Sequence, residues 1–259
     1  MKPTLMSLVL AACSPAEDTR PRPTTIPADA REIDNDVYSL GTHIDPETGE
    51  DIEGFAFVDR IEDPNAIIDD APADGAARRG CFLTLGFGGW SSVEGWGLDS
   101  TNSSGLSAAD IQETIEQGHA LWEAASTANI FGKYDASYSG DAARSSDGEN
   151  NVAFGDAGGG GTVAITYIWG RASGALSDRY ISEWDQIYDD RYDWSIGDPV
   201  DSGAFDLLDV AAHELGHALG LGHPVGTCSN ETMYAYVSTG ETKKRTLNTG
   251  DLGGLRSIY

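Results

Sequence analysis

Between positions 213 and 223 the chain carries residue types at a spacing that suits a hydrolytic metal site. The segment reads HELGHALGLGH, so His213, His217 and His223 follow the pattern HExxHxxGxxH. On a helix, His213 and His217 lie one turn apart on the same face. Gly220 can end that helix with a positive φ and turn the chain back, so that His223 supplies a third nitrogen. Three neutral imidazoles predict a zinc ion that keeps its fourth position open for water, which is typical of catalytic zinc sites.

Glu214 is the expected general base of this site. It lies about 100° further round the helix than the first histidine, where it can reach a water on the metal without binding the metal itself. We expect it to take a proton as water attacks a carbonyl polarised by zinc, and to deliver that proton to the departing amine. The alternative, a chance set of histidines on an amphipathic helix, is disfavoured because five residues match over eleven positions. The helix is also apolar at Leu207, Leu208, Val210, Ala211, Leu215, Ala218 and Leu219.

Charge and apolar patterning limit the class of protein. The chain has 259 residues and a formal net charge of −26, which repels phosphate backbones and excludes nucleic acid as a partner. The same acidity supplies carboxylates for calcium. Regular apolar patterning begins near Cys81, so we predict one folded domain over residues 81–259 and a monomeric protein.

The first residues are typical of an export signal. Lys2 precedes a short apolar stretch, Leu5–Ala12, that is too short to span a bilayer, so we expect residues 1–12 to be a signal peptide. The stretch ends in Leu-Ala-Ala-Cys13, which resembles the lipobox of bacterial lipoproteins. The resemblance implies lipid on Cys13 and membrane contact only through that anchor, at an outer membrane or cell surface. An ordinary signal peptide with an incidental cysteine, and hence secretion, is the alternative.

Two further cysteines remain once Cys13 is acylated. Cys81 and Cys228 then form an even pair in an oxidising compartment, which predicts a disulfide. The alternative is that Cys81 is an inhibitory zinc ligand. Its flanking residues, Arg78-Arg79-Gly80, lack the pattern that such cysteine switches need, so the disulfide is favoured.

The region before the main domain divides into two parts. Residues 13–31 are rich in Pro, Thr, Ala and charge, and read as a flexible tether. In residues 32–80, the segments Thr42–Ile44 and Ile52–Val58 flank the turn-forming segment 45–50 and predict a hairpin. This part is either a small pro-segment or an N-terminal extension packed on the domain. The pair Arg78-Arg79 would suit a processing protease or would simply be solvated.

The main domain has the element order of an α+β fold, with a mixed sheet above the metal helix. A capping box at Ser107 and a buried stripe through Ile111, Ile115 and Trp122 predict a helix, and place His119 in the core rather than at a metal. Strands are expected at residues 81–87, 151–154, 163–169 and 181–188, and further helices at 204–219 and from 249 to the end.

A methionine turn completes the motif. Thr232-Met233-Tyr234 follows His223, and this combination resembles the metzincin clan of zinc proteases. Within the clan the chain is most similar to the matrixins, over about residues 81–259, because its ending LNTGDLGGLRSIY resembles theirs. Ala235 stands where astacins and serralysins place a metal-binding tyrosine, which argues against both.

The matrixin resemblance implies roles for several residues. Met233 would form an apolar floor below the zinc without binding it. The strand at 163–169 would be an edge strand that pairs with extended substrate. Tyr234 and Tyr236 would help line the pocket for the residue after the cut.

Departures from the animal matrixins concern their other metals. Residues 156–164 resemble the glycine-rich metal loop, but Ile165 and Ile187 replace histidines of a structural zinc site, so no second zinc is expected. Calcium could bind through Asp156, Asp189 and Asp190, or these could be solvated loop acids. A propeptide cysteine motif and a C-terminal propeller-like domain are not found, which groups the chain with bacterial matrixin-like proteases and leaves its latency open.

The expected function is a zinc-dependent endopeptidase, exported from a bacterial cell, that cleaves extracellular proteins or peptides. The first alternative is a catalytically inactive surface binding or adhesion lipoprotein with a metzincin fold. The second is a metal-dependent hydrolase of non-peptide bonds.

Overall fold

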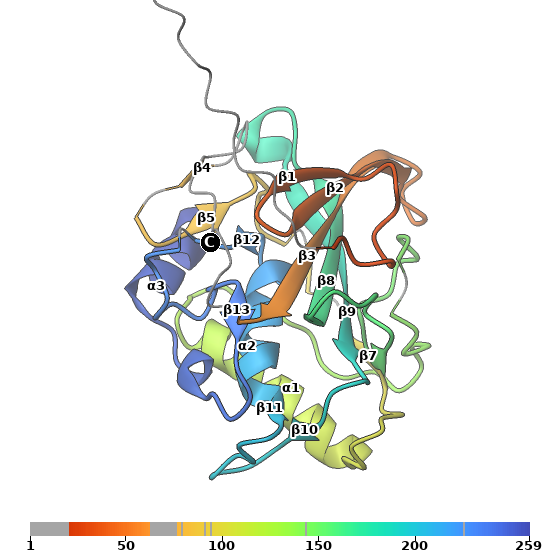
Figure 1. Cartoon of the computed structure of the whole chain (residues 1–259). Helices are drawn as coiled ribbons and strands as arrows, with labels where there is room; N and C mark the ends of the chain where they lie inside the picture. Colours follow the sequence, from red (N-terminus) through yellow and green to blue (C-terminus); the bar gives the residue numbers. More distant parts are fainter. Residues whose placement is uncertain are drawn as a thin grey trace, which may run out of the picture.

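The computed structural model describes residues 21–62, 77, 78, 80–90, 92, 93, 95–142, 144–224 and 226–259. The architecture is α+β, as predicted, with one mixed sheet and helices packed against one of its faces (Figure 1). The predicted signal peptide, the lipidation site Cys13 and Arg79 lie outside the described residues.

The main sheet has eight strands, and its first three come from the region before the predicted domain. The order across the sheet is β1 (Arg31–Asp34), β2 (Val37–Ile44), β3 (Asp51–Ile61), β8 (Thr162–Arg171), β9 (Tyr180–Asp189), β7 (Asn151–Gly155) and β6 (Gly97–Asp99), with β13 (Tyr236–Val237) beside β3. The pairs β1–β2, β2–β3, β3–β8 and β8–β9 are antiparallel, whereas β9–β7, β7–β6 and β3–β13 are parallel.

The predicted hairpin in the N-terminal region is confirmed as β2 and β3. Their register runs from Val37 opposite Phe57 to the turn at residues 45–50. Asp45 forms that turn, because its Oδ1 accepts hydrogen bonds from the backbone N–H of Glu47 and Thr48 at 2.9 and 2.8 Å.

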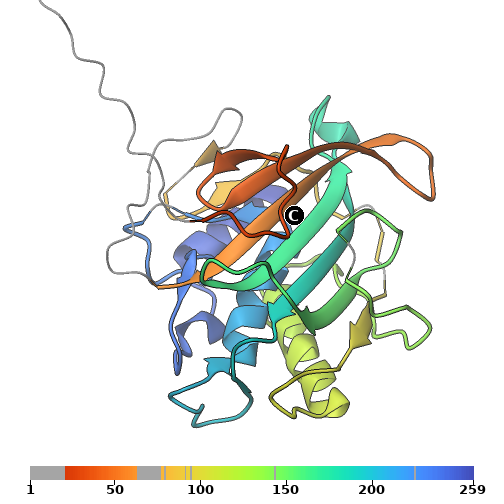
Figure 2. The same ribbon diagram turned by 45° about the vertical axis from the view of Figure 1, so that its right-hand side comes forward.

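The predicted edge strand at residues 163–169 is not an edge strand in the structure. It lies within β8, which pairs with β9 on one side and with β3 on the other. The β3 pairing runs from Glu53 opposite Gly170 to Arg60 opposite Thr162. Figure 2 shows β3 lying along β8 in front of the helices. The prediction was wrong because a residue pattern does not reveal which distant segment will pair with an exposed edge.

The predicted helices are confirmed, with one corrected boundary. Helix α1 (Ala108–Glu123) begins at Ser107, whose side chain accepts a hydrogen bond from Asp110 N. Helix α2 (Leu207–Ala218) starts later than residue 204, because Asp206 caps it by accepting a hydrogen bond from Asp209 N at 2.6 Å. The preceding residues form the short strand pair β10 (Trp194–Ser195) and β11 (Phe205–Asp206), and the chain ends in α3 (Thr249–Ile258).

The strand predicted at residues 81–87 is mostly wrong. Only β5 (Leu83–Thr84) is extended and paired, and it lies between β4 (Ala77–Arg78) and β12 (Leu221–Gly222) in a separate small sheet. Gly86 has a φ of +83°, so the chain turns away after two paired residues. The remaining short elements are the 3₁₀ turns η1 (Leu176–Asp178) and η2 (Lys243–Arg245).

Two apolar cores lie on opposite faces of the sheet, because successive strand side chains point to opposite sides. The inner core, between sheet and helices, contains Phe57 and Ile168 together with Trp122 and Leu215 of the helices. The outer core is built largely by the N-terminal region and the facing strand residues: Ile26, Ala30, Tyr38, Ile52, Ala56, Val58, Ala142, Ala157, Ile165, Tyr167, Trp169 and Ile187.

Close contact with α1 fixes the position of α2. Gly118 leaves room for Leu215, since a Cβ at Gly118 would lie 2.6 Å from Leu215 Cδ1. The indole of Trp122 donates a hydrogen bond to the backbone oxygen of Ala212 at 2.8 Å. These two contacts therefore fix the rotation and the height of α2 relative to α1.

Candidate metal centre

Three histidine side chains converge at the C-terminal end of α2. His213 and His217 project from one face of the helix, and Gly220, with a φ of +89°, turns the chain so that His223 joins them. The Nε2 atoms of His213 and His217 are 3.0 Å apart, and those of His213 and His223 are 3.3 Å apart. All three side chains are buried. The structure thus brings together the three predicted zinc ligands.

The other ring nitrogen of each histidine faces a backbone carbonyl. His213 Nδ1 lies 2.7 Å from the oxygen of Thr232, and His217 Nδ1 lies 2.7 Å from that of Leu221. His223 Nδ1 lies 3.1 Å from the oxygen of Asn35. A carbonyl oxygen can only accept, so each Nδ1 carries the proton and each Nε2 presents a lone pair.

This donor set fits a zinc ion. Three nitrogens around tetrahedral zinc, at roughly 2.0–2.1 Å from the metal, are about 3.3 Å from one another. The observed separations of 3.0 and 3.3 Å are close to that spacing. Burial lowers the pKa of His213 and of His217 well below the usual value, so both rings are neutral and able to bind a metal.

Glu214 lies beside the histidines with one free oxygen. Its side chain is fully buried, and its Oε2 accepts a hydrogen bond from the hydroxyl of Thr166 on β8. Among the described residues, no hydrogen-bond donor reaches Oε1. Burial, and then the negative charge of Asp59, raise the pKa of Glu214 well above that of an ordinary glutamate. A carboxylate in this state is suited to accept and return a proton.

Met233 packs directly against the backbone of the zinc helix. It is 1% exposed, and a Cβ on Gly216 would lie 2.1 Å from its Sδ. Gly216 is therefore required for the methionine to approach the helix so closely. The role of Met233 as an apolar floor below the zinc stays a prediction.

Asp251, in the first turn of α3, holds the methionine turn in place. Its carboxylate accepts hydrogen bonds from the backbone N–H of Thr232 at 2.9 Å and of Met233 at 3.1 Å. It also accepts one from Asn248 N at 2.8 Å, which caps the helix. The same carboxylate thus orders both the end of the domain and the carbonyl that orients His213.

A disulfide joins Cys81 to Cys228, with an S–S distance of 2.06 Å and a Cα–Cα distance of 5.5 Å. It connects the segment just before β5 to the loop between His223 and Met233. Cys81 is therefore bonded to another cysteine and is not available as a metal ligand.

Comparison with known proteins agrees with this geometry. The family model described as Matrixin matches residues 94–259, which is more than half of the chain and includes the whole histidine motif. The chain belongs to the matrixin family.

Individual relatives share only parts of their length with this matrixin. Human matrix metalloproteinase-25 is 37% identical over 75 residues, which cover 29% of this chain and 13% of that protein. Human matrix metalloproteinase-16 is 37% identical over 101 residues, covering 39% of this chain and 14% of that protein. The hatching enzyme of Paracentrotus lividus is 40% identical over 75 residues, covering 29% and 12%. The chain therefore spans far less than two thirds of these relatives.

Tyr234 and Tyr236, predicted to line a substrate pocket, form a small cluster with Ala235. Their rings meet edge to face, with centroids 5.6 Å apart. Tyr236 lies in β13, where it pairs with Arg60 of β3. The N-terminal strand therefore adjoins this part of the matrixin, and the pocket role of both tyrosines stays a prediction.

The three predicted calcium ligands are not gathered into one group. Asp189 is buried and ion-paired with Arg191, and it also accepts a hydrogen bond from Ala157 N at 3.1 Å. Asp190 accepts one from Ser103 N at 2.7 Å. Asp156 is exposed. Among the described residues, two groups of His, Asp and Glu side chains could hold a metal ion, and neither group includes any of these three aspartates. Calcium binding stays a prediction, and Arg191 beside Asp189 weighs against it.

The two positions where isoleucines replace the histidines of a second zinc site lie opposite each other in the sheet and are apolar. Ile165 on β8 lies opposite Ile187 on β9, and both belong to the outer core. Within the described residues, this face of the sheet offers no metal-binding group at these two positions.

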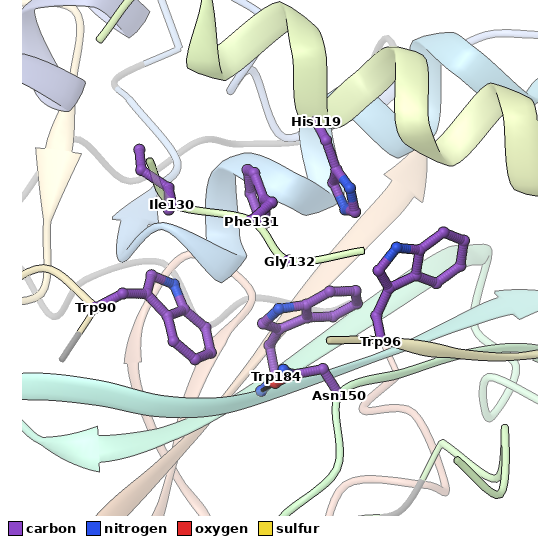
Figure 3. Close-up of a pocket in the computed structure, with 8 residues that line it drawn as sticks. All are labelled: Trp90, Trp96, His119, Ile130, Phe131, Gly132, Asn150 and Trp184. Atoms are coloured by element: carbon purple, nitrogen blue, oxygen red, sulfur yellow. Dashed lines mark hydrogen bonds between the residues drawn. The ribbon is translucent and has the colours of Figure 1, made fainter. Parts of the chain in front are cut away.

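His119 is a core residue, as predicted. Figure 3 shows its ring pointing from α1 into a pocket lined by aromatic side chains. It stacks on Phe131 with ring centroids 4.3 Å apart and meets Trp96 edge to face. Burial lowers the pKa of His119 from its usual 6.5 to about 3, so the ring is neutral.

Several residues at the centre were not predicted from the sequence. Asp59 and Lys244 are fully buried beside His213, with Lys244 Nζ 3.6 Å from Asp59 Oδ1 and 3.4 Å from His213 Nδ1. Thr166 was visible as a polar residue inside an apolar strand, a signal that could have marked it. Asn35 and Asp59 carry no such signal, because they lie more than 150 residues before the motif that they contact.

Proposed function

We propose that this matrixin is a zinc-dependent endopeptidase. One observation carries the proposal: three imidazoles present their Nε2 atoms to one point, and a carboxylate with a free oxygen lies beside them. Membership of the matrixin family supports it. When bound there, zinc supplies Lewis acidity that polarises a carbonyl and makes water nucleophilic at neutral pH.

The residues of the chain then have separate tasks. His213, His217 and His223 hold the metal, each oriented by a carbonyl that accepts from Nδ1. Glu214 accepts a proton from the attacking water at its free Oε1 and passes it to the amine that leaves. Thr166 keeps the other oxygen of Glu214 fixed, so the carboxylate does not rotate toward the metal.

Hydrolysis of a protein substrate tests the proposal. The zinc-loaded chain should digest casein or a peptide library, before or after limited proteolysis, and a chelator should stop the reaction. Glu214→Gln should retain zinc and lose the hydrolysis. A zinc-loaded sample that cuts no peptide in either state would favour the alternatives, an adhesion protein or a hydrolase of non-peptide bonds.

The setting of the enzyme is part of the proposal. The signal and lipobox pattern supports export from a bacterial cell, attachment by lipid on Cys13, and extracellular proteins as substrates. In the described part of the chain, no helix is both long and apolar enough to cross a membrane. Mass spectrometry of the mature protein would report the acylation and any trimming of residues 32–80.

A further inference from the structure

Asp59, near the end of β3, brings a second carboxylate to the metal centre. It is fully buried, and its ligand atom and those of His213 and Glu214 all lie within 4.8 Å of one another. Asp59 Oδ1 is 4.0 Å from His213 Nε2, the atom that faces the metal. Neither oxygen of Asp59 accepts a hydrogen bond from the described residues. His217 and His223 lie outside this group, so Asp59 approaches the centre from the side of His213. A buried carboxylate that has no hydrogen-bond donor and lies next to the atom facing the metal can complete a metal site.

The ion pair with Lys244 does not account for Asp59 by itself. The Nζ of Lys244 is 3.6 Å from Asp59 Oδ1, which exceeds a hydrogen-bond distance. Lys244 therefore balances the charge of the carboxylate but leaves its lone pairs unused. Both side chains have no exposed area, so solvent does not complete them.

The backbone around Asp59 lies between two strands of the matrixin domain. On one side, Arg60 N donates to Ala235 O at 3.3 Å and Glu62 N donates to Val237 O at 2.9 Å. On the other side, Ile61 N donates to Gly161 O at 2.9 Å. An extended substrate bound by strand addition to β8 would use these same backbone groups. In Figure 1 the end of β3 lies beside β13, in front of α2.

The N-terminal segment, residues 21–62, also contacts the other two histidines. Phe57 of β3 stacks on the ring of His217, with centroids 4.2 Å apart and planes 16° apart. The carbonyl of Asn35, in the turn between β1 and β2, accepts the hydrogen bond from His223 Nδ1 at 3.1 Å. Each histidine of the centre therefore has a neighbour in this segment.

We propose that Asp59 is a fourth ligand of the zinc ion, held by β3 in the cleft where a substrate would bind. The proposal rests on the proposed function, because it takes the three histidines as a zinc site. A carboxylate at the fourth position keeps water away from Glu214. The chain with β3 in place is therefore latent, and hydrolysis requires that β3 leave the cleft. This latency needs no cysteine ligand.

A cysteine at position 59 tests the contact directly. In full-length Asp59→Cys loaded with Co²⁺, which takes zinc sites of this kind, a thiolate on the metal should give a sulfur-to-cobalt charge-transfer band. A metal–sulfur bond, at about 2.3 Å, is longer than a metal–oxygen bond and offsets part of the difference in side-chain length. The control is Asp51→Cys, at the exposed start of the same strand, which should show no band.

The outcomes separate the two proposals. Cobalt bound by Asp59→Cys without the band, together with equal rates of zinc loss from Asp59→Asn and Asp51→Asn, would overturn the role of Asp59 and leave the zinc site intact. Wild-type protein that binds neither Co²⁺ nor Zn²⁺ would overturn the proposed function as well.

A second measurement does not depend on the new cysteine. Full-length Asp59→Asn should lose zinc to excess chelator at least about tenfold faster than Asp51→Asn, since even an indirect partner of a ligand changes metal affinity by that factor. Equal rates in the two folded variants would contradict the proposal.

Discussion

Two regions meet at the metal centre, and each brings a buried carboxylate. Glu214 comes from the zinc helix, where Gly216, Met233 and Thr166 fix its surroundings by close packing and a hydrogen bond. Asp59 comes from the N-terminal segment, where strand pairing with β8 and β13 holds it. The first region is anchored by the inner core and a disulfide. The second region pairs with β8 and β13, adds Phe57 to the inner core and builds much of the outer core.

This difference between the two regions separates the residues that carry out the chemistry from the segment that controls access to them. The residues that bind metal and move a proton lie within eleven positions of one another, so their spacing is constrained by one helix and one turn. The segment that covers them contributes an extended backbone and the side chains of Asp59 and Phe57, which lie beside His213 and His217. The catalytic residues are therefore close together in the sequence, whereas the N-terminal segment that covers them reaches the site through strand pairing over long sequence distances.

The largest expected effect distinguishes the two carboxylates. In any form of the chain that hydrolyses peptides, Glu214→Gln should lower kcat by about 10²–10⁴-fold, because the proton acceptor is lost. Asp59→Asn should cause no such loss. Peptide cleavage rates, with zinc content measured on the same samples, check this contrast. Equal losses in both variants would mean that the carboxylates do not have separate roles.

The next largest effect should come from the disulfide, which stabilises the region of the zinc helix. The bridge spans 147 residues of sequence, so Cys81→Ser with Cys228→Ser should lower the free energy of unfolding by about 2–5 kcal/mol. Urea titration of the oxidised wild type and of the double variant measures the difference. An unchanged stability would show that the loop between His223 and Met233 does not depend on this anchor.

Packing beneath the zinc helix should have a smaller effect. Gly216→Ala places a Cβ 2.1 Å from Met233 Sδ, so we expect a loss of about 1–3 kcal/mol in stability and weaker zinc binding. Gly155→Ala on β7 is the matched control, because the nearest atom, Ile187 Cγ2, is 3.9 Å away. Thermal unfolding of both variants tests this, and similar losses would argue against a special contact at Gly216.

The smallest effect concerns His119, in helix α1. Burial lowers the pKa of His119 from 6.5 to about 3, so between these values the unfolded chain binds more protons than the folded one. The contribution of the neutral ring to the free energy of unfolding is therefore fully present above pH 6.5. It is lost as the pH falls, by about 1 kcal/mol between pH 6 and pH 5. His119→Phe should remove this part of the acid dependence.

Urea titrations at several pH values measure that change. Subtracting the profile of the variant from that of the wild type cancels the contribution of the zinc ligands, which titrate in both. A difference that does not change with pH would contradict a buried neutral histidine.

Much of the metal centre was predictable, because its parts are close in sequence. His213, His217, His223 and Glu214 follow from helical spacing, and Met233 follows from the resemblance to metzincins. The hairpin of β2 and β3 was also predicted, from two segments that flank a turn-rich stretch. Its partner was not, since period-two patterning identifies a strand but not the strand it pairs with. For that reason Asp59 and Asn35 could not be connected to the histidines.

Local details of the other elements also depend on tertiary structure. The strand expected at residues 81–87 is cut short by Gly86, whose positive φ no residue pattern revealed. Asp251 was visible only as part of the matrixin-like ending, and its hydrogen bonds to the methionine turn required the fold.

Anomalous diffraction at the zinc edge from crystals of the full-length, zinc-loaded chain would test the central claim most directly. We expect one peak at about 2.0–2.1 Å from the Nε2 atoms of His213, His217 and His223, with an oxygen of Asp59 as the fourth neighbour. A peak elsewhere in the chain, or none beside these three nitrogens, would contradict the account.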